Sequence, residues 1–165
     1  MKAYADGSLK LRMAAEKDVP VILQLILELA EFEGVRDQIR STEEGLKDVL
    51  FERHIADALI AELDGVPVGF AIWAYSFSTF TGKPTLYIDD LYVQEPYRGR
   101  GIGSRIFSRI AEIACEKDCA RVDWYCMETN VSGKDYYHKM GAEEIEWFKV
   151  FRLNRDQLEE MRDRA

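Results

Sequence analysis

The chain has 165 residues, 47% hydrophobic and 32% charged, which predicts one globular domain with a substantial core. It lacks an apolar run of membrane-spanning length, and Met1–Asp6 has no apolar signal region, so we expect a cytoplasmic protein with no membrane partner. The formal charge of −8 disfavours binding to nucleic acid, which needs clustered cations, and suits a small cationic substrate.

The first half of the chain predicts a strand and two helices. Residues 1–7 are expected to be a flexible end, followed by a single domain over residues 8–165. Apolar and charged residues alternate over residues 9–13, which indicates a strand. Helical spacing of apolar residues predicts a helix over residues 19–32, with Asp18 as N-cap and Gly34 as terminator. A second helix is expected to start at Thr42.

The pattern then changes to a period of two. Strands are expected over residues 58–63, 68–75 and 86–93, with Asp64-Gly65 as a hairpin turn, and together they predict an antiparallel meander. A helix follows near Gly103, then a strand over residues 121–127, a short helix over residues 135–140 and a final strand over residues 146–153. The strand–helix–strand unit requires a parallel pair near the centre of the sheet. The expected fold is therefore α/β (α+β), a mixed, mostly antiparallel sheet with helices on its faces.

A glycine-rich loop between a predicted strand and a predicted helix is the most informative segment. Glycines at positions 99, 101 and 103 let the backbone turn tightly, and a helix start offers N–H groups to a phosphate. Arg98 and Arg100 add positive charge, so a pyrophosphate is the predicted ligand. The spacing differs from the G-x-G-x-x-G of a Rossmann site, and the G-K-[ST] of a P-loop is absent. A plain glycine-rich turn is the remaining alternative.

The segment Arg98-x-x-Gly101-x-Gly103 resembles the R/Q-x-x-G-x-G/A acetyl-CoA motif of the GNAT N-acetyltransferases, and the order of elements resembles that fold over residues 9–153. Within this superfamily the chain is most similar to the spermidine/spermine (diamine) and thialysine N-acetyltransferases. The similarity lies in residues 25–33, 86–93, 97–103, 130 and 136–142. The resemblance implies a sheet of six to seven strands with a parallel pair splayed at its centre, and a homodimer.

The same resemblance implies acetyl-CoA as co-substrate. Main-chain groups of Leu91, Tyr92 and Val93 would pair with the pantetheine arm, and Asn130 and Tyr137 would also contact the cofactor. The pyrophosphate would be held by the loop residues Arg98, Gly99, Arg100, Gly101, Ile102, Gly103 and Ser104. No metal is expected, because Cys115 and Cys119 would need two further ligands, and neither histidine lies nearby in sequence.

Transfer of an acetyl group to an amine requires the amine to lose its proton and the thiol to gain one. Asp89 and Asp90 occupy adjacent strand positions, so they are expected to point to opposite faces, and the resemblance favours Asp89 as proton acceptor. A tyrosine hydroxyl is a suitable acid for a departing thiolate, and Tyr137 is the candidate, with Tyr136 as alternative. Direct attack by the amine is favoured over a covalent route through Cys126.

Phe32, Glu33, Asp89 and Asp90 are the expected amine-binding residues, with Phe32 as an aromatic wall. The expected substrate is a small primary amine, either a diamine or polyamine or a thialysine-like compound. The loop over residues 76–80 lacks the acidic residue that some polyamine enzymes carry there, which favours thialysine or another small amine. Acetylation of a peptide or protein amine and a non-catalytic acyl-CoA-binding module are the alternatives.

Overall fold

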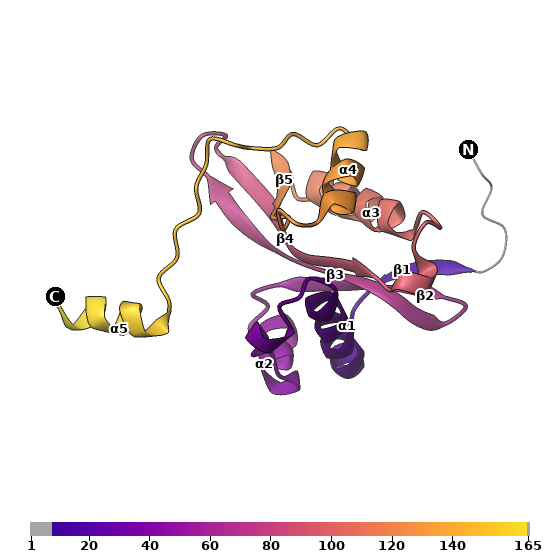
Figure 1. Cartoon of the computed structure of the whole chain (residues 1–165), viewed down its shortest axis with the longest axis horizontal. Helices are drawn as coiled ribbons and strands as arrows, with labels where there is room; N and C mark the ends of the chain where they lie inside the picture. Colours follow the sequence, from indigo (N-terminus) through magenta and orange to yellow (C-terminus); the bar gives the residue numbers. More distant parts are fainter. Residues whose placement is uncertain (1–7, 165) are drawn as a thin grey trace. The chain divides into compact units, whose positions relative to one another are not determined.

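Five strands form one sheet in the spatial order β1-β2-β3-β4-β5 within the part of the chain that the structure, a computed structural model, describes: residues 8–164. Neighbouring strands pair antiparallel except for β4 and β5, which pair parallel (Figure 1). The mixed, mostly antiparallel sheet is therefore confirmed, although the strand count is lower than expected. The strands are β1 (Leu9–Met13), β2 (Asp57–Leu63), β3 (Val66–Ser78), β4 (Lys83–Val93) and β5 (Arg121–Trp124).

The chain divides into two compact units, Met1–Met127 and Glu128–Ala165, which are described separately. The first holds the sheet with helices α1 (Val19–Phe32), α2 (Glu43–Lys47) and α3 (Ile102–Glu116), and the π-helix η3 (Asp48–Glu52) continues α2. It also holds the short 3-10 turns η1 (Glu16–Asp18), η2 (Arg36–Gln38) and η4 (Glu95–Tyr97). The second unit holds α4 (Val131–Lys139) and α5 (Arg155–Asp163). The single domain over residues 8–165 stays a prediction, and the expected flexible end, residues 1–7, lies outside the described residues.

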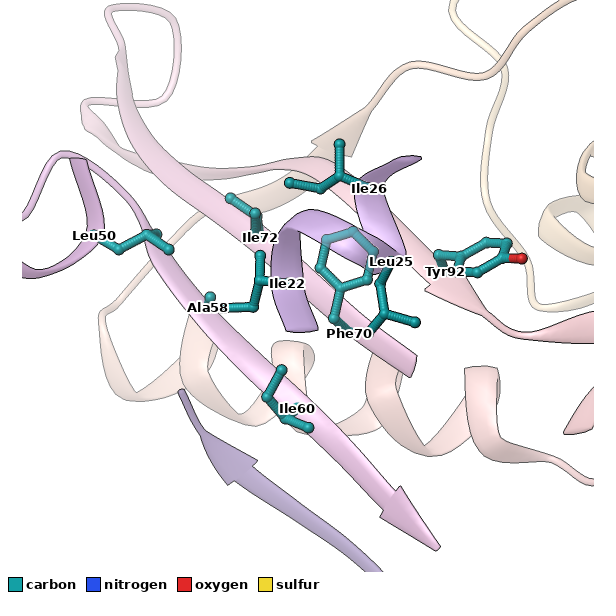
Figure 2. Close-up of a cluster of buried hydrophobic side chains, with 9 residues drawn as sticks. All are labelled: Ile22, Leu25, Ile26, Leu50, Ala58, Ile60, Phe70, Ile72 and Tyr92. Carbon is teal, nitrogen blue, oxygen red and sulfur yellow. The ribbon is translucent and has the colours of Figure 1, made fainter. Parts of the chain in front are cut away.

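In the first unit, α1 and α3 cover opposite faces of the sheet (Figure 1). Figure 2 shows the core on the α1 face, where the ring of Tyr92 ends the cluster and its hydroxyl points away from it. Because β-strand side chains alternate between faces, only every second residue of β2 and β3 contributes to this core. Its buried members are Ile22, Leu25, Ile26, Leu50, Ala58, Ile60, Phe70, Ile72 and Tyr92.

Local signals in the sequence account for the element ends in the first unit. Asp64 and Gly65 both have positive φ, 53° and 80°, which is the geometry of a type I′ hairpin turn. Gly34, with φ 72°, follows the end of α1, and Thr42 accepts the N–H of Gly45 as the N-cap of α2. These predicted boundaries are confirmed.

Asp18 precedes α1 as predicted, but its side chain does not cap that helix. Its carboxylate instead accepts two hydrogen bonds from Arg12 and one from the N–H of Ala15, at 2.6 to 2.9 Å. Arg12 also donates to Glu62, so one guanidinium links β1, η1 and β2. A bidentate, charge-assisted contact with a guanidinium is stronger than a hydrogen bond from a neutral main-chain N–H. This difference explains why the Asp18 carboxylate turns toward Arg12.

The strand expected over residues 146–153 is absent, and this prediction was wrong. The segment is irregular, and Trp147 and Phe151 are 74% and 92% exposed. Alternating apolar residues make a strand only beside a partner that takes up the main-chain hydrogen bonds, and residues 128–164 contain none. The strand expected over residues 121–127 ends at Trp124, which leaves Cys126 half-buried in a loop.

Candidate active site

A β-bulge interrupts β4 at Asp89. Ile72 of β3 pairs with Asp90, and the next residue, Trp73, pairs with Ile88, so Asp89 is left without a partner of its own. Parallel pairing with β5 ends one residue earlier, at Ile88 and Trp124. Beyond Ile88, no strand among the described residues pairs with the edge of β4 that faces away from β3. The parallel pairing therefore ends where the bulge begins.

The pairing register of β3 and β4 shows which main-chain groups of β4 face this open edge. Gln94 donates its N–H to Val68 on β3, and hydrogen-bonding direction alternates along an antiparallel strand. Leu91 and Val93 consequently direct their main-chain groups toward the open edge, whereas those of Tyr92 face β3. Of the three residues expected at the pantetheine arm, Leu91 and Val93 are oriented for main-chain pairing, and that role stays a prediction.

The glycine loop closes directly onto the start of α3. Gly99 and Gly101 have φ values of 73° and 77°, a left-handed conformation that favours glycine, and Gly101 is the N-cap. The first helical bond runs from Arg105 N–H to Gly101 oxygen, so the N–H groups of Ile102 and Gly103 point out of the helix start. Ser104 completes this first turn.

Gly103 has no structural requirement for glycine within the protein. It lies in α3, and a Cβ at this position would meet no protein atom within 4 Å. Alanine favours a helix by about 1 kcal/mol over glycine. A glycine that packing does not require fits a ligand that approaches the backbone closely, as a diphosphate at a helix start would.

The two loop arginines have different surroundings. Arg98 donates its Nε–H to the Val93 oxygen at 2.8 Å, and its guanidinium lies 4.2 Å from the Phe32 ring centroid and 5.3 Å from that of Tyr92. Arg100 lies 5.5 Å from the ring centroid of Tyr97. Phe32, expected as an aromatic wall for the amine, thus already contacts a cation of the protein itself.

An acidic pair lies beside this cluster, between the end of α1 and β4. Asp90 pairs with Ile72, and Tyr92 pairs with Phe70, so Asp90 occupies the sheet face covered by α1. Burial, together with the charges of Asp89 and Glu33, raises the pKa of Asp90 from an ordinary 3.8 to about 7. Burial also raises the pKa of Glu33. Glu33 and Asp90 therefore form a partly buried acidic surface suited to an amine cation.

The bulge changes the expected relation between the two aspartates. Strict alternation predicts opposite faces, but alternation is broken at Asp89, and the charge of Asp89 acts on Asp90. Asp89 is exposed, whereas Asp90 is largely buried. Sequence reasoning did not single out Asp90 as the perturbed carboxylate, because its burial depends on α1 packing over β4.

The second unit carries Asn130 and Tyr137. Asn130 is the N-cap of α4, and its side-chain oxygen accepts the N–H of Gly133 at 2.9 Å. A Cβ on Gly133 would lie 2.6 Å from the Asn130 amide nitrogen, so this cap requires glycine there. Tyr137 is half-buried on α4, and its ring meets that of Tyr136 edge-on with centroids 5.7 Å apart. The cofactor and catalytic roles of these residues stay predictions.

Residues 8–164 contain no helix long and apolar enough to cross a membrane. The same part of the chain holds no cluster of three or more histidine, cysteine, aspartate or glutamate side chains placed to bind a metal ion.

The fold and the loop agree with a family match. Residues 23–142 match the model described as the acetyltransferase (GNAT) family. The chain belongs to this family of acetyltransferases.

Comparison with individual proteins gives the subgroup. Thialysine N-epsilon-acetyltransferase of Bos taurus is 34% identical over 163 residues, which cover 92% of this chain and 95% of that protein. Spermidine/spermine N(1)-acetyltransferase-like protein 1 of Homo sapiens is 32% identical, and the match covers 92% of this chain and 23% of that protein. The resemblance to thialysine and spermidine/spermine enzymes is confirmed, and the chain is an N-acetyltransferase.

The fold has a counterpart among solved structures. An integron cassette protein from the mobile metagenome of V. cholerae superposes with a TM-score of 0.78 at 22% identity, covering 94% of this chain and 98% of that one. At this identity the likeness concerns the fold alone.

Proposed function

We propose that this enzyme transfers the acetyl group of acetyl-CoA to a small primary amine of the thialysine or diamine type. Gly103 is the observation that supports acetyl-CoA as the acetyl donor. It is a helical glycine that packing within the protein does not require, and it lies at the start of α3, where N–H groups are available to a diphosphate. Leu91 and Val93 would hold the pantetheine arm through their main-chain groups at the open edge of β4. Main-chain N–H groups of Arg98–Ser104, together with Asn130, complete the proposed cofactor contacts.

The acidic pair supports a cationic acceptor. Glu33 at the end of α1 and Asp90 on β4 present carboxylates, Asp89 adds a third on β4, and the whole chain carries a formal charge of −8. The names of the relatives, thialysine and spermidine/spermine enzymes, point to the same chemical class. Residues 76–80, at the end of β3, contain no acidic side chain, so a short amine fits better than a long polyamine.

Acetyl-CoA supplies the acetyl group as a thioester, whose sulfur departs as a thiol. In the proposed reaction the carboxylates Asp89 and Asp90 attract the ammonium group and one of them accepts its proton, after which the neutral amine attacks the carbonyl carbon of the thioester directly. Asp90 is suited to this role, because a base works best when its pKa lies near the working pH and that of Asp90 is raised to about 7. As the C–S bond breaks, Tyr137 donates its hydroxyl proton to the departing sulfur, and the second proton lost by the attacking nitrogen restores the hydroxyl.

The test is a thiol-release assay with acetyl-CoA and a set of amines: thialysine, lysine, putrescine, spermidine, spermine and a basic peptide. The proposal expects the highest kcat/KM with thialysine or a short diamine and a lower value with spermine. Highest turnover with the peptide would instead indicate a protein acetyltransferase. Binding of CoA without thiol release from any amine would indicate a non-catalytic acyl-CoA-binding module.

The homodimer implied by the resemblance is also proposed here. Exposed apolar side chains in the second unit, namely Phe148, Val150 and Phe151, are available for such a contact. Light scattering after size-exclusion chromatography should give twice the 19.0 kDa mass of the chain. A mass of one chain at micromolar concentration contradicts the dimer.

A further inference from the structure

Arg98 joins three elements of the first unit. Its Nε–H donates to the oxygen of Val93, the last residue of β4, at 2.8 Å. Its guanidinium carbon lies 4.2 Å from the ring centroid of Phe32, the last residue of α1, and 5.3 Å from that of Tyr92. Through this side chain, the loop that leads to α3 contacts both β4, which precedes it, and α1, which covers one face of the sheet.

These contacts depend on properties of the arginine side chain that lysine does not have. A guanidinium is planar, so it can lie over an aromatic ring while its edge donates in a fixed direction. A lysine ammonium keeps the charge but has neither the flat face nor the directional Nε–H. Arg100, two residues later, lies 5.5 Å from the ring centroid of Tyr97, a residue of the same loop region.

The contact also reaches the proposed amine site. Phe32 directly precedes Glu33, and Tyr92 is two residues from Asp90 on the same sheet face. Hydrogen bonds from the N–H groups of Tyr97 and Arg98 to the oxygens of Gln94 and Glu95 close the turn η4, and the loop after it is exposed at Gly99 and Arg100. The side chain of Arg98 links this loop to Val93 at the end of β4 and to Phe32 at the end of α1.

We propose that Arg98 is a positioning residue that fastens the glycine loop to Phe32 and Val93, and that it acts through this geometry rather than as a charge on the diphosphate. The inference rests on the proposed function, since it assumes that the loop binds the diphosphate of CoA. The fastening holds the N–H groups of Ile102 and Gly103 in place and ties the loop to the end of α1, beside Glu33.

The experiment measures the dissociation constant of CoA by calorimetry at two salt concentrations for the wild type, R98K, R100K, F32L and F32L/R98K. R98K and R100K each retain the positive charge, so they form a matched pair. We expect R98K to weaken CoA binding about tenfold, equal to about 1.4 kcal/mol, and R100K to weaken it much less. F32L, which removes the ring and no charge, should also weaken binding.

Two further readouts separate positioning from general damage. Since Phe32 and Arg98 act through one contact, the loss in F32L/R98K should be smaller than the product of the two single losses. In turnover assays, R98K should raise the KM for acetyl-CoA more than it lowers kcat, whereas partial unfolding would lower kcat alone. A thermal melt of each variant reports folding, and F32L carries the test by itself if R98K does not fold.

The outcomes are distinct. R98K that binds CoA as tightly as the wild type, or R98K and R100K with equal losses, overturns the positioning role. Fully multiplicative effects of F32L and R98K also overturn it. A wild-type protein that binds no CoA contradicts the proposed function instead, before any variant is compared.

Discussion

The charge of Glu33, at the end of α1, acts on the partly buried carboxyl group of Asp90 on β4. Burial is the main cause that raises the pKa of Asp90 to about 7, and the charges of Asp89 and Glu33 add to it. Near neutral pH this carboxyl group therefore exists in both protonation states. A bound amine cation would favour the ionised state, so substrate binding and proton uptake are linked at this position.

The first prediction concerns pH and folding stability. The folded-state pKa of Asp90 lies above its ordinary value of 3.8, so its protonated form stabilises the fold fully below that value. This contribution should be lost as pH rises, over a window from about 4 to about 7. Urea unfolding at several pH values should show the loss in the wild type, and D90N should flatten it.

D89N is the matched control, because Asp89 is the neighbouring carboxylate on β4 and is exposed. Its effect should be limited to a smaller upward shift of the Asp90 pKa, since one neighbouring charge is removed. Equal pH dependence of unfolding in the wild type and D90N would show that the burial of Asp90 is weaker than described. In turnover assays, D90N should lower kcat/KM more than D89N does.

A second prediction concerns the ion cluster of Arg12, Asp18 and Glu62. The Asp18 side chain is 7% exposed and bonded at 2.6 Å to Arg12, whose hydrogen bonds lower the pKa of Asp18. D18A leaves a partly buried guanidinium with Glu62 as its remaining partner, so we expect a loss of about 2 kcal/mol in unfolding free energy. E112A, which breaks an exposed pair with Arg109, should cost no more than about 0.5 kcal/mol.

The sign of the pH dependence differs from that of Asp90. A lowered pKa means that the stabilisation from Asp18 is present above its ordinary pKa and disappears as pH falls through the folded value. Denaturant titrations from pH 6 down to pH 2 should show this loss in the wild type and a smaller one in D18A. Identical acid profiles would contradict it.

Local patterns were sufficient where neighbouring residues decide the structure. The helix over residues 19–32 has the spacing of one apolar face, and the Asp64-Gly65 turn needs two residues that tolerate positive φ. The glycine loop was found in the same way, because strand, glycines and helix start are contiguous. These features need no knowledge of distant contacts.

Features set by distant partners could not be read from the pattern. The bulge at Asp89 depends on the register with β3, and the orientation of Asp18 depends on Arg12 of a different element. The segment over residues 146–153 has the composition of a strand, yet a strand also needs a neighbouring edge. The contact between Arg98 and Phe32 joins residues 66 positions apart, and no spacing rule predicts it.

A third prediction separates two glycines of the loop. G103A should raise the thermal midpoint slightly, because alanine is the better helix former and meets no protein atom, while it weakens CoA binding by about tenfold or more. G101A should lower the midpoint, because Gly101 has φ 77°, a conformation that costs other residues roughly 1 kcal/mol. Calorimetry with CoA and thermal melts check both. Tight CoA binding by G103A would remove the main support for a diphosphate at this helix start.

The last prediction concerns Tyr137 as the acid for the departing thiol. Y137F keeps the ring that packs against Tyr136 and removes only the hydroxyl. A general acid contributes about 100-fold or more to the rate, so kcat should fall by that factor while CoA affinity changes little. Y136F is the matched control on the same helix and should retain most of the wild-type kcat. If Y137F turns over at the wild-type rate and Y136F does not, the acid is Tyr136; if both retain full kcat, neither hydroxyl protonates the leaving group.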